Sequence, residues 1–290
     1  MKDTTKGKYM LITSMVLFGT VGVFRSFIPL SSALLACLRG LIGGVFLILL
    51  LVIRRKKPDF AAIKKNLLVL LLSGAALGIN WVLLFEAINY SGVATATLCY
   101  YLAPILILLV APFVLRERLT VRKMLCVAAA LCGMVFVSGV LTDGFSGLTG
   151  ILFGLGAACL YATVVLLNKK ISGLDSLDKT IVQLLVSAPV TFVYALNSKE
   201  GISFAACDMT AVALIIIVGI VHTGVCYALY FGSANYLKAQ TLAIFSYIDP
   251  VVAVLLSALF LHEPMDIFSI VGAVLILGAA LISELPERKR

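Results

Sequence analysis

Apolar residues fill most of the chain in long runs, and short polar stretches separate these runs. A helix needs about 20 mostly apolar residues to cross a bilayer, and ten segments of the chain meet that requirement. The turn-forming residues Asn89-Tyr90-Ser91-Gly92 and the stretch 143–147 mark two of the short loops between them. The pattern predicts an all-α integral membrane protein with ten transmembrane helices, at residues 9–27, 32–53, 66–89, 93–115, 122–140, 148–168, 178–197, 210–235, 239–260 and 267–284.

One stretch of the sequence occurs twice. Residues 81–119 align with residues 227–265 at a shift of 146 positions and without a gap. Apolar sequences often match by chance at Leu or Val, but these two copies also share less common residues. The shared residues include Asn89-Tyr90 with Asn235-Tyr236, Tyr101 with Tyr247, Pro104 with Pro250, and Leu115-x-Glu117 with Leu261-x-Glu263. We interpret this as an internal duplication that divides the chain into halves 1–143 and 144–290.

An odd number of helices in each half has a geometric consequence. The second half enters the membrane from the opposite side, so the halves are expected to be inverted repeats around a central cavity. In transporters built this way the substrate site lies near the middle of the bilayer, at the interface of the repeats. If the two halves exchange conformations, an outward opening becomes an inward one.

Composition and charge agree with this picture. The chain is 62% hydrophobic and 13% charged, whereas a soluble domain has roughly 25% charged residues. The net charge of +9 is scattered between apolar runs, so no basic face for nucleic acid is expected. Twenty of the 23 basic residues fall on one side of the predicted topology, only Arg25 and Lys199 on the other, and Arg39 lies within a helix. Because basic loops stay in the cytoplasm, both termini are predicted to be cytoplasmic.

The duplicated stretch resembles a known family. The pattern N-x-x-x-x-F-x-A-x-x-Y at Asn80, Phe85, Ala87 and Tyr90, followed by Pro104 and the L-x-E at Leu115, resembles the EamA-type members of the drug/metabolite transporter superfamily. Residues 231–263 resemble the second EamA unit. The resemblance implies a plasma-membrane carrier of small metabolites, often an exporter of amino acids or related compounds. It implies no metal and no organic cofactor, and it places Asn80 beside the substrate site.

Two charged residues lie within the apolar segments near the predicted outer side. Arg39 lies about 10 Å below the outer end of the second helix, and Glu86 lies four residues from the outer end of the third. A charge inside the bilayer costs roughly 2.5–3.5 kcal/mol on insertion scales. Arg39 therefore either binds a substrate carboxylate, pairs with Glu86, or snorkels outward. Glu86 is either part of the substrate site or a helix-end carboxylate in contact with water.

His222 and Asp249 are expected near the middle of the bilayer. His222, Cys226 and Tyr230 repeat at i, i+4 and i+8, so one polar face of the eighth helix is predicted to turn inward. Both His and Asp exchange protons, so the two residues are candidates for proton coupling. A static hydrogen-bonded pair, or no contact at all, remains the alternative.

Aromatic residues gather in the duplicated stretch. Rings with a polar tip suit a cavity for amphipathic ligands, although such residues also anchor helices at the interface or pack. The candidates for cavity lining are Trp81, Tyr100, Tyr101, Tyr227, Tyr230 and Tyr247. Pro104 and Pro250 each remove a helix hydrogen bond. They are predicted to be hinges or static kinks at equivalent positions.

Other classes of protein fit less well. An intramembrane enzyme would need a nucleophile with a base, paired aspartates or an HExxH motif, and we expect none from two distant histidines and spans that we expect to lack lysine. A channel would need a continuous polar stripe, and a scaffold or sensor would not need inverted repeats. The sequence predicts a secondary transporter of small molecules in a lipid bilayer. It leaves open proton coupling and the choice between monomer and homodimer.

Overall fold

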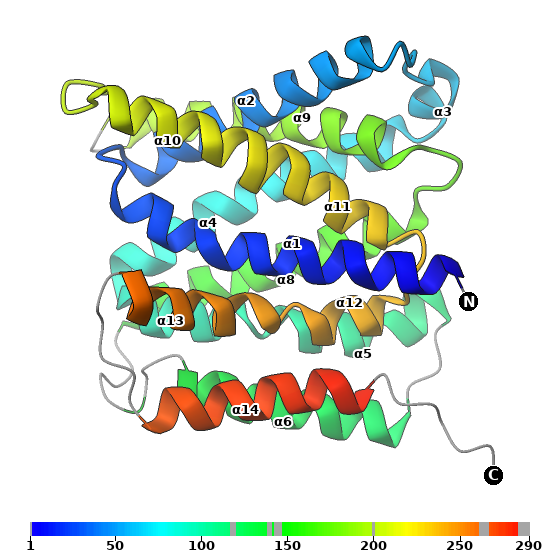
Figure 1. The fold of residues 1–290 in the computed structure, drawn as a ribbon, viewed down its shortest axis with the longest axis vertical. Helices are drawn as coiled ribbons and strands as arrows, with labels where there is room; N and C mark the ends of the chain where they lie inside the picture. The colour runs from blue at the N-terminus through cyan, green and yellow to red at the C-terminus, as the bar shows by residue number, and fades with distance from the viewer. Residues whose placement is uncertain are drawn as a thin grey trace.

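The computed structural model describes residues 2–116, 120–137, 141, 147–198, 201–260 and 267–283, and its regular elements are helices throughout this part of the chain (Figure 1). The expectations for Glu117, Glu263 and Lys199 lie outside the described residues. The first half contains α1 (Lys2–Ser26), α2 (Ser32–Ile53), α3 (Phe60–Lys65), α4 (Leu67–Tyr100), α5 (Ala103–Leu115) and α6 (Val121–Val137). The second half contains α8 (Leu148–Lys170), α9 (Ser176–Asn197), α10 (Met209–Gly219), the π-helix η1 (Ile220–Val225), α11 (Cys226–Ser233), α12 (Ala239–Phe245), α13 (Ile248–Phe260) and α14 (Ile267–Ser283).

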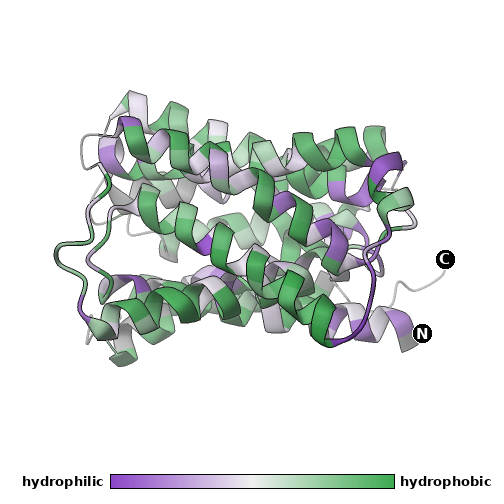
Figure 2. Ribbon diagram, turned by 90° about the horizontal axis from the view of Figure 1, so that it is seen from above, coloured by the Kyte–Doolittle hydropathy of each residue, from purple (hydrophilic) through white to green (hydrophobic). Residues whose placement is uncertain are grey.

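The helices lie side by side with their long axes roughly aligned (Figure 1). Six helical stretches of the described chain are long and apolar enough to cross a membrane, namely 3–26, 32–53, 67–91, 148–170, 176–197 and 209–233. Large apolar side chains such as Phe113, Leu68 and Val274 are exposed along the outside. Hydrophilic residues lie mostly at the helix ends and in the connections, as Figure 2 shows. This distribution is that of a multi-pass membrane protein.

The turn predicted at 89–92 is a reversal within a helix. The hydrogen-bonded pattern of α4 continues through these residues to Tyr100. Even so, a methyl group built on Gly154 would lie 3.7 Å from Cβ of Ala87 and 3.5 Å from the carbonyl oxygen of Ala96. Nine residues of straight helix would hold those two residues about 13 Å apart. The chain therefore turns back on itself near Ser91, as predicted. The predicted end of the helical hydrogen bonding at residue 89 was wrong, because the pattern continues to Tyr100.

Two predicted helices are broken at positions that are equivalent to within one residue. The predicted helix 93–115 is interrupted at Tyr101 and Leu102, between α4 and α5. The predicted helix 239–260 is interrupted at Ser246 and Tyr247, between α12 and α13. Pro104 and Pro250 follow these breaks by two and three residues, because a proline cannot donate the hydrogen bond that would continue the helix.

The halves exchange their first helices. In the first half α1 packs mainly against α11 and α13, which belong to the second half, while α8 of the second half packs mainly against α4 of the first. Gly19 of α1 lies against Asp249 and Val252, and Gly150 and Gly154 of α8 lie against Ser91 and Cys99. These glycines allow the helices to approach closely.

Equivalent helices run in opposite directions. The beginning of α1 at Gly7 lies against Tyr236 and Leu237, and the end of α8 at Lys169 donates hydrogen bonds to the carbonyl oxygens of Ala234 and Leu237. The start of one helix and the end of its equivalent thus meet the same turn. In Figure 1, α1 begins at the side of the molecule where this turn lies, and the last helix, α14, ends there.

Candidate functional site

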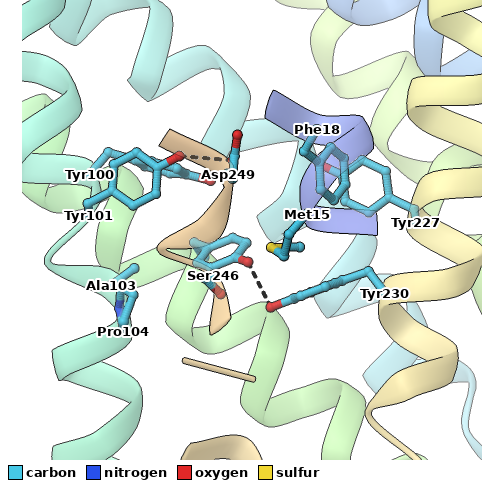
Figure 3. A pocket seen from close by; sticks show the side chains of 11 residues that line it. Met15, Phe18, Tyr100, Tyr101, Ala103, Pro104, Tyr227, Tyr230, Ser246 and Asp249 are labelled. Atoms are coloured by element: carbon cyan, nitrogen blue, oxygen red, sulfur yellow. Dashed lines mark hydrogen bonds between the residues drawn. The ribbon is translucent and has the colours of Figure 1, made fainter. Parts of the chain in front are cut away.

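A cavity of about 70 Å³ lies among α1, α4, α5, α8, α11, α13 and the break before α13 (Figure 3). Its walls come from both halves, and most of its side chains are aromatic. The lining residues are Met15, Phe18, Tyr100, Tyr101, Ala103, Pro104, Tyr161, Tyr227, Tyr230, Ser246 and Asp249. At about 30 Å³ per water, this space has room for a few water molecules.

Residues that are equivalent in the two halves contact each other beside this cavity. Trp81 and Tyr227 are 146 positions apart, and the indole Nε1 of Trp81 donates a hydrogen bond of 3.1 Å to the hydroxyl of Tyr227. Tyr101 and Tyr247 have the same separation, and their ring centroids lie 6.0 Å apart. In an object with two-fold symmetry a group can touch its own copy only near the axis. Because Tyr101 and Tyr227 both line the cavity, the cavity lies on the axis between these two contacts.

Asp249 supplies the one carboxylate among the residues that line the cavity. The hydroxyl of Tyr101 donates a hydrogen bond of 2.9 Å to its Oδ2 atom. Elsewhere in the wall, the Tyr161 hydroxyl donates a hydrogen bond of 2.7 Å to the Tyr230 hydroxyl. Asp249 enters the cavity because it lies at the beginning of α13, directly after the helix break.

The break between α4 and α5 has a partner for its freed backbone. The hydroxyl of Tyr247 donates a hydrogen bond of 2.8 Å to the carbonyl oxygen of Tyr101. Such a carbonyl needs a partner away from water, and here the partner comes from the equivalent break in the other half. Tyr247 is fully buried and is not a lining residue.

A second polar group lies next to the cavity. Nε of Arg39 donates a hydrogen bond of 3.0 Å to the Thr223 hydroxyl, and the guanidinium lies 4.8 Å from the ring centroid of Trp81. His222, which is 2% exposed, has its Nε2 atom 2.6 Å from the hydroxyl of Thr20. Arg39 does not line the cavity. It contacts Trp81, which in turn donates a hydrogen bond to the lining residue Tyr227.

The structure separates some residues that the sequence grouped together. Of the alternatives for Arg39, the pairing with Glu86 is not seen, since no ion pair joins them in the described chain; Arg39 instead contacts Thr223 and Trp81. No hydrogen bond or ion pair joins His222 to Asp249 in the described structure: His222 contacts Thr20 of α1, and the Asp249 side chain accepts a hydrogen bond from Tyr101. Asn80 is fully buried and its Nδ2 donates to the carbonyl oxygen of Ala157 at 2.7 Å, which ties α4 to α8.

Several features of this region were missed from the sequence. Tyr161 lines the cavity from α8, and its hydroxyl deep in an apolar segment is the signal that could have found it. The π-helix η1, which carries His222 and Thr223, has no signal in the sequence. Lys179 is predicted to lie at the polar, basic-rich end of the helix 178–197, but it is 0% exposed within α9, with Nζ 3.3 Å from Oδ1 of Asn235. The expectation that no span holds a lysine was therefore wrong.

Opposed halves around an axial cavity define the architecture of a membrane carrier with an inverted repeat. Comparison with known sequences supplies the family. The model of the EamA-like transporter family matches residues 5–139 and again residues 148–284. The chain belongs to the EamA-like transporter family and is a multi-pass membrane transporter.

Individual relatives agree with this assignment. The chain is 31% identical to the uncharacterized transporter YxxF of Bacillus subtilis over 288 residues, which cover 97% of this chain and 90% of the relative. It is 28% identical to protein RarD of Salmonella typhi over 200 residues, covering 69% and 66% of the two chains. A solved crystal structure of 19% sequence identity superposes with a TM-score of 0.86 over 97% of both chains, which shows the shared fold.

Proposed function

We propose that this protein is a secondary active transporter that exports small amphipathic metabolites, such as amino acids or related compounds, across the plasma membrane by alternating access. The observation that carries the proposal is the position of the cavity on the axis between two equivalent, oppositely directed sets of helices. A rocking exchange of the two halves opens such a cavity first to one side and then to the other.

The proposed architecture has ten passes in two units, 1–143 and 144–290, with both termini in the cytoplasm. The reversal in α4 supports two passes for residues 67–115, and the broken helices α10–η1–α11 and α12–α13 supply one pass each. The two segments matched by the family model leave the boundary at 143/144 between them. The concentration of basic residues on one side supports the orientation.

In this proposal Tyr100, Tyr101, Tyr227 and Tyr230 contact the substrate. Trp81 and Tyr247 support that wall from behind, and Pro104 and Pro250 are the hinges at the two helix breaks. Arg39 sets the electrostatic potential from behind Trp81. Asn80 and Glu86 act only through the position of α4, since neither lines the cavity.

We further propose that protons drive transport and that Asp249 is the coupling residue. It lies in the cavity wall, where a substrate and a proton can both reach it. His222 is the second candidate, because it is a buried imidazole with its Nε2 atom 2.6 Å from the hydroxyl of Thr20. The two residues have different partners, Thr20 for His222 and Tyr101 for Asp249, so we propose separate roles and no direct relay.

Purified protein in liposomes tests this proposal. We expect exchange of at least one labelled amino acid or related metabolite across the vesicle membrane, and faster uptake when a pH gradient is imposed. In Asp249→Asn, we expect even the exchange that needs no gradient to be slow or absent. His222→Gln should change only the response of transport to pH. Transport of no candidate under any gradient would contradict the proposed function. Transport that ignores the pH gradient would contradict proton coupling alone.

A further inference from the structure

The charges around the cavity have one sign. Asp249 is the ionisable carboxylate of the wall, and none of the lining side chains is Lys, Arg or His. Within the described residues no ion pair joins Asp249 to a basic side chain, and its carboxylate accepts a hydrogen bond from the neutral hydroxyl of Tyr101. A carboxylate inside a membrane is costly unless a partner balances its charge. The cavity therefore favours a positively charged occupant.

Aromatic rings continue around this carboxylate. Neighbouring ring centroids in the wall are separated by 5.0 to 6.3 Å. The series runs from Tyr101 to Tyr100, Tyr161, Tyr230, Phe18 and Tyr227. Figure 3 shows these rings on opposite sides of the space that Asp249 borders. Grouped aromatic rings attract cations, and quaternary ammonium ligands are recognised in this way.

The basic residue nearest to this wall does not offset the carboxylate. The guanidinium of Arg39 lies against the Trp81 ring and bonds to Thr223, and Arg39 is not a lining residue. A substrate carboxylate in the cavity would meet Asp249 and tyrosine hydroxyls without a cationic partner. Anions, and zwitterions whose carboxylate must also be held, fit the wall less well than amines.

We infer that the cavity takes an organic cation, with a primary or quaternary ammonium group held by the Asp249 carboxylate and the surrounding aromatic rings. The inference rests on the proposed function, since it names the substrate class of the same cavity. The present volume of about 70 Å³ suits an ammonium head group. Met15, whose flexible side chain adapts its shape easily, is the part of the wall that can yield to an apolar body.

A set of four phenyl compounds separates charge from shape. The probes are 2-phenylethylamine, its neutral counterpart 2-phenylethanol, the anion 3-phenylpropanoate and the zwitterion phenylalanine. Binding to the full-length protein in detergent is measured by thermal stabilisation and by direct titration. Exchange of each labelled compound is measured in liposomes. The variant is Asp249→Asn, which keeps the shape of the side chain, and its matched control is Asp3→Asn, whose carboxyl is exposed at the start of α1.

We expect 2-phenylethylamine to bind at least about tenfold more tightly than the other three compounds. Asp249→Asn should remove that preference, and Asp3→Asn should retain it. Equal binding of the amine and the alcohol by the wild-type protein would overturn the inference, and this comparison holds even if the variant does not fold. Exchange of phenylalanine or phenylpropanoate without the amine would also overturn it, while leaving the proposed transport function intact.

Discussion

The two halves of this protein share a backbone arrangement but differ in chemistry where they meet. Both halves break a helix at the cavity, and equivalent aromatic residues touch across the axis. Yet Asp249 of the second half stands where the first half has Ala103, and Ser246 stands where it has Tyr100. All four residues line the same cavity. The symmetric features build the carrier, and the asymmetric ones are expected to set what it carries.

The position of the carboxylate provides the largest test of this contrast. We expect Asp249→Ala to lower substrate exchange by at least about tenfold, because the charge that holds the substrate is lost. Adding Ala103→Asp to that variant should restore part of the activity, since the equivalent residue faces the same cavity. Initial exchange rates in liposomes measure both effects. Normal exchange by Asp249→Ala would show that the asymmetry has no role in transport.

Larger side chains at the closely packed glycines of α1 and α8 should destabilise the fold to a similar extent. A methyl group on Gly19 would lie 2.7 Å from the carbonyl oxygen of Asp249, and one on Gly154 would lie 2.7 Å from Cβ of Cys99. We expect each change to alanine to destabilise the fold by about 1–3 kcal/mol, partly offset by the better helix propensity of alanine. Gly22→Ala is the control, because nothing lies within 4 Å of its added methyl group. Thermal unfolding in detergent that ranks all three alike would argue against this packing.

Tyr101 and Tyr247 are equivalent in sequence but should differ in effect. Tyr247→Phe leaves the carbonyl oxygen of Tyr101 without its hydroxyl partner, so we expect a loss of stability of about 1–3 kcal/mol and little change in substrate preference. Tyr101→Phe removes the donor to Asp249, so we expect weaker or altered substrate binding with a smaller loss of stability. Thermal unfolding and ligand titration of both variants would reveal the opposite pattern if the assignment is wrong.

The smallest effect is expected at the connections between helices. Lys56 Nζ lies 2.8 Å from Asp175 Oδ2, and this ion pair joins the α2–α3 and α8–α9 connections. At the other end of the molecule, the α1–α2 and α9–α10 connections line a hollow of about 360 Å³, and Arg25, Ser31 and Ser203 are among its lining residues. The hydrogen bond from Lys56 lowers the pKa of Asp175 below its usual value.

A carboxyl whose pKa is lower in the folded than in the unfolded state stabilises the fold above the unfolded pKa. That contribution disappears as the pH falls through the folded pKa, which for Asp175 lies below the usual value of an aspartate. We expect Lys56→Met to cause a slight fall in thermal stability at neutral pH and none at a pH well below 4. Lys57→Met is the matched control for loss of a nearby charge. A large effect of Lys56→Met on transport would instead assign the pair to a gate.

How much of this could be predicted depends on the kind of interaction. The apolar runs and the repeat of Tyr101 and Pro104 at Tyr247 and Pro250 were sufficient to predict the helical membrane fold and the sites of the helix breaks. The partner of Arg39 could not be predicted. Thr223 accepts its hydrogen bond from within a π-helix, and no residue pattern in the sequence predicts that π-helix.

Depth in the membrane was a weaker guide than the neighbouring helices. His222 and Asp249 share an expected depth, but the first contacts Thr20 and the second contacts Tyr101. Lys179 was placed near the polar end of its helix, yet the folded chain buries it against Phe231 and Asn235. Sequence position gives the height of a residue in a span, whereas the packing of other helices decides which neighbour it meets.

Labelling of a cysteine at Ser246 tests most directly whether the axial cavity is the substrate site. The variant is made in a chain without its seven native cysteines that still exchanges substrate in liposomes. We predict that a small, positively charged thiol reagent modifies this cysteine and that transported substrate slows the reaction. A cysteine that exchanging protein leaves unmodified, or that substrate fails to protect, would contradict the account.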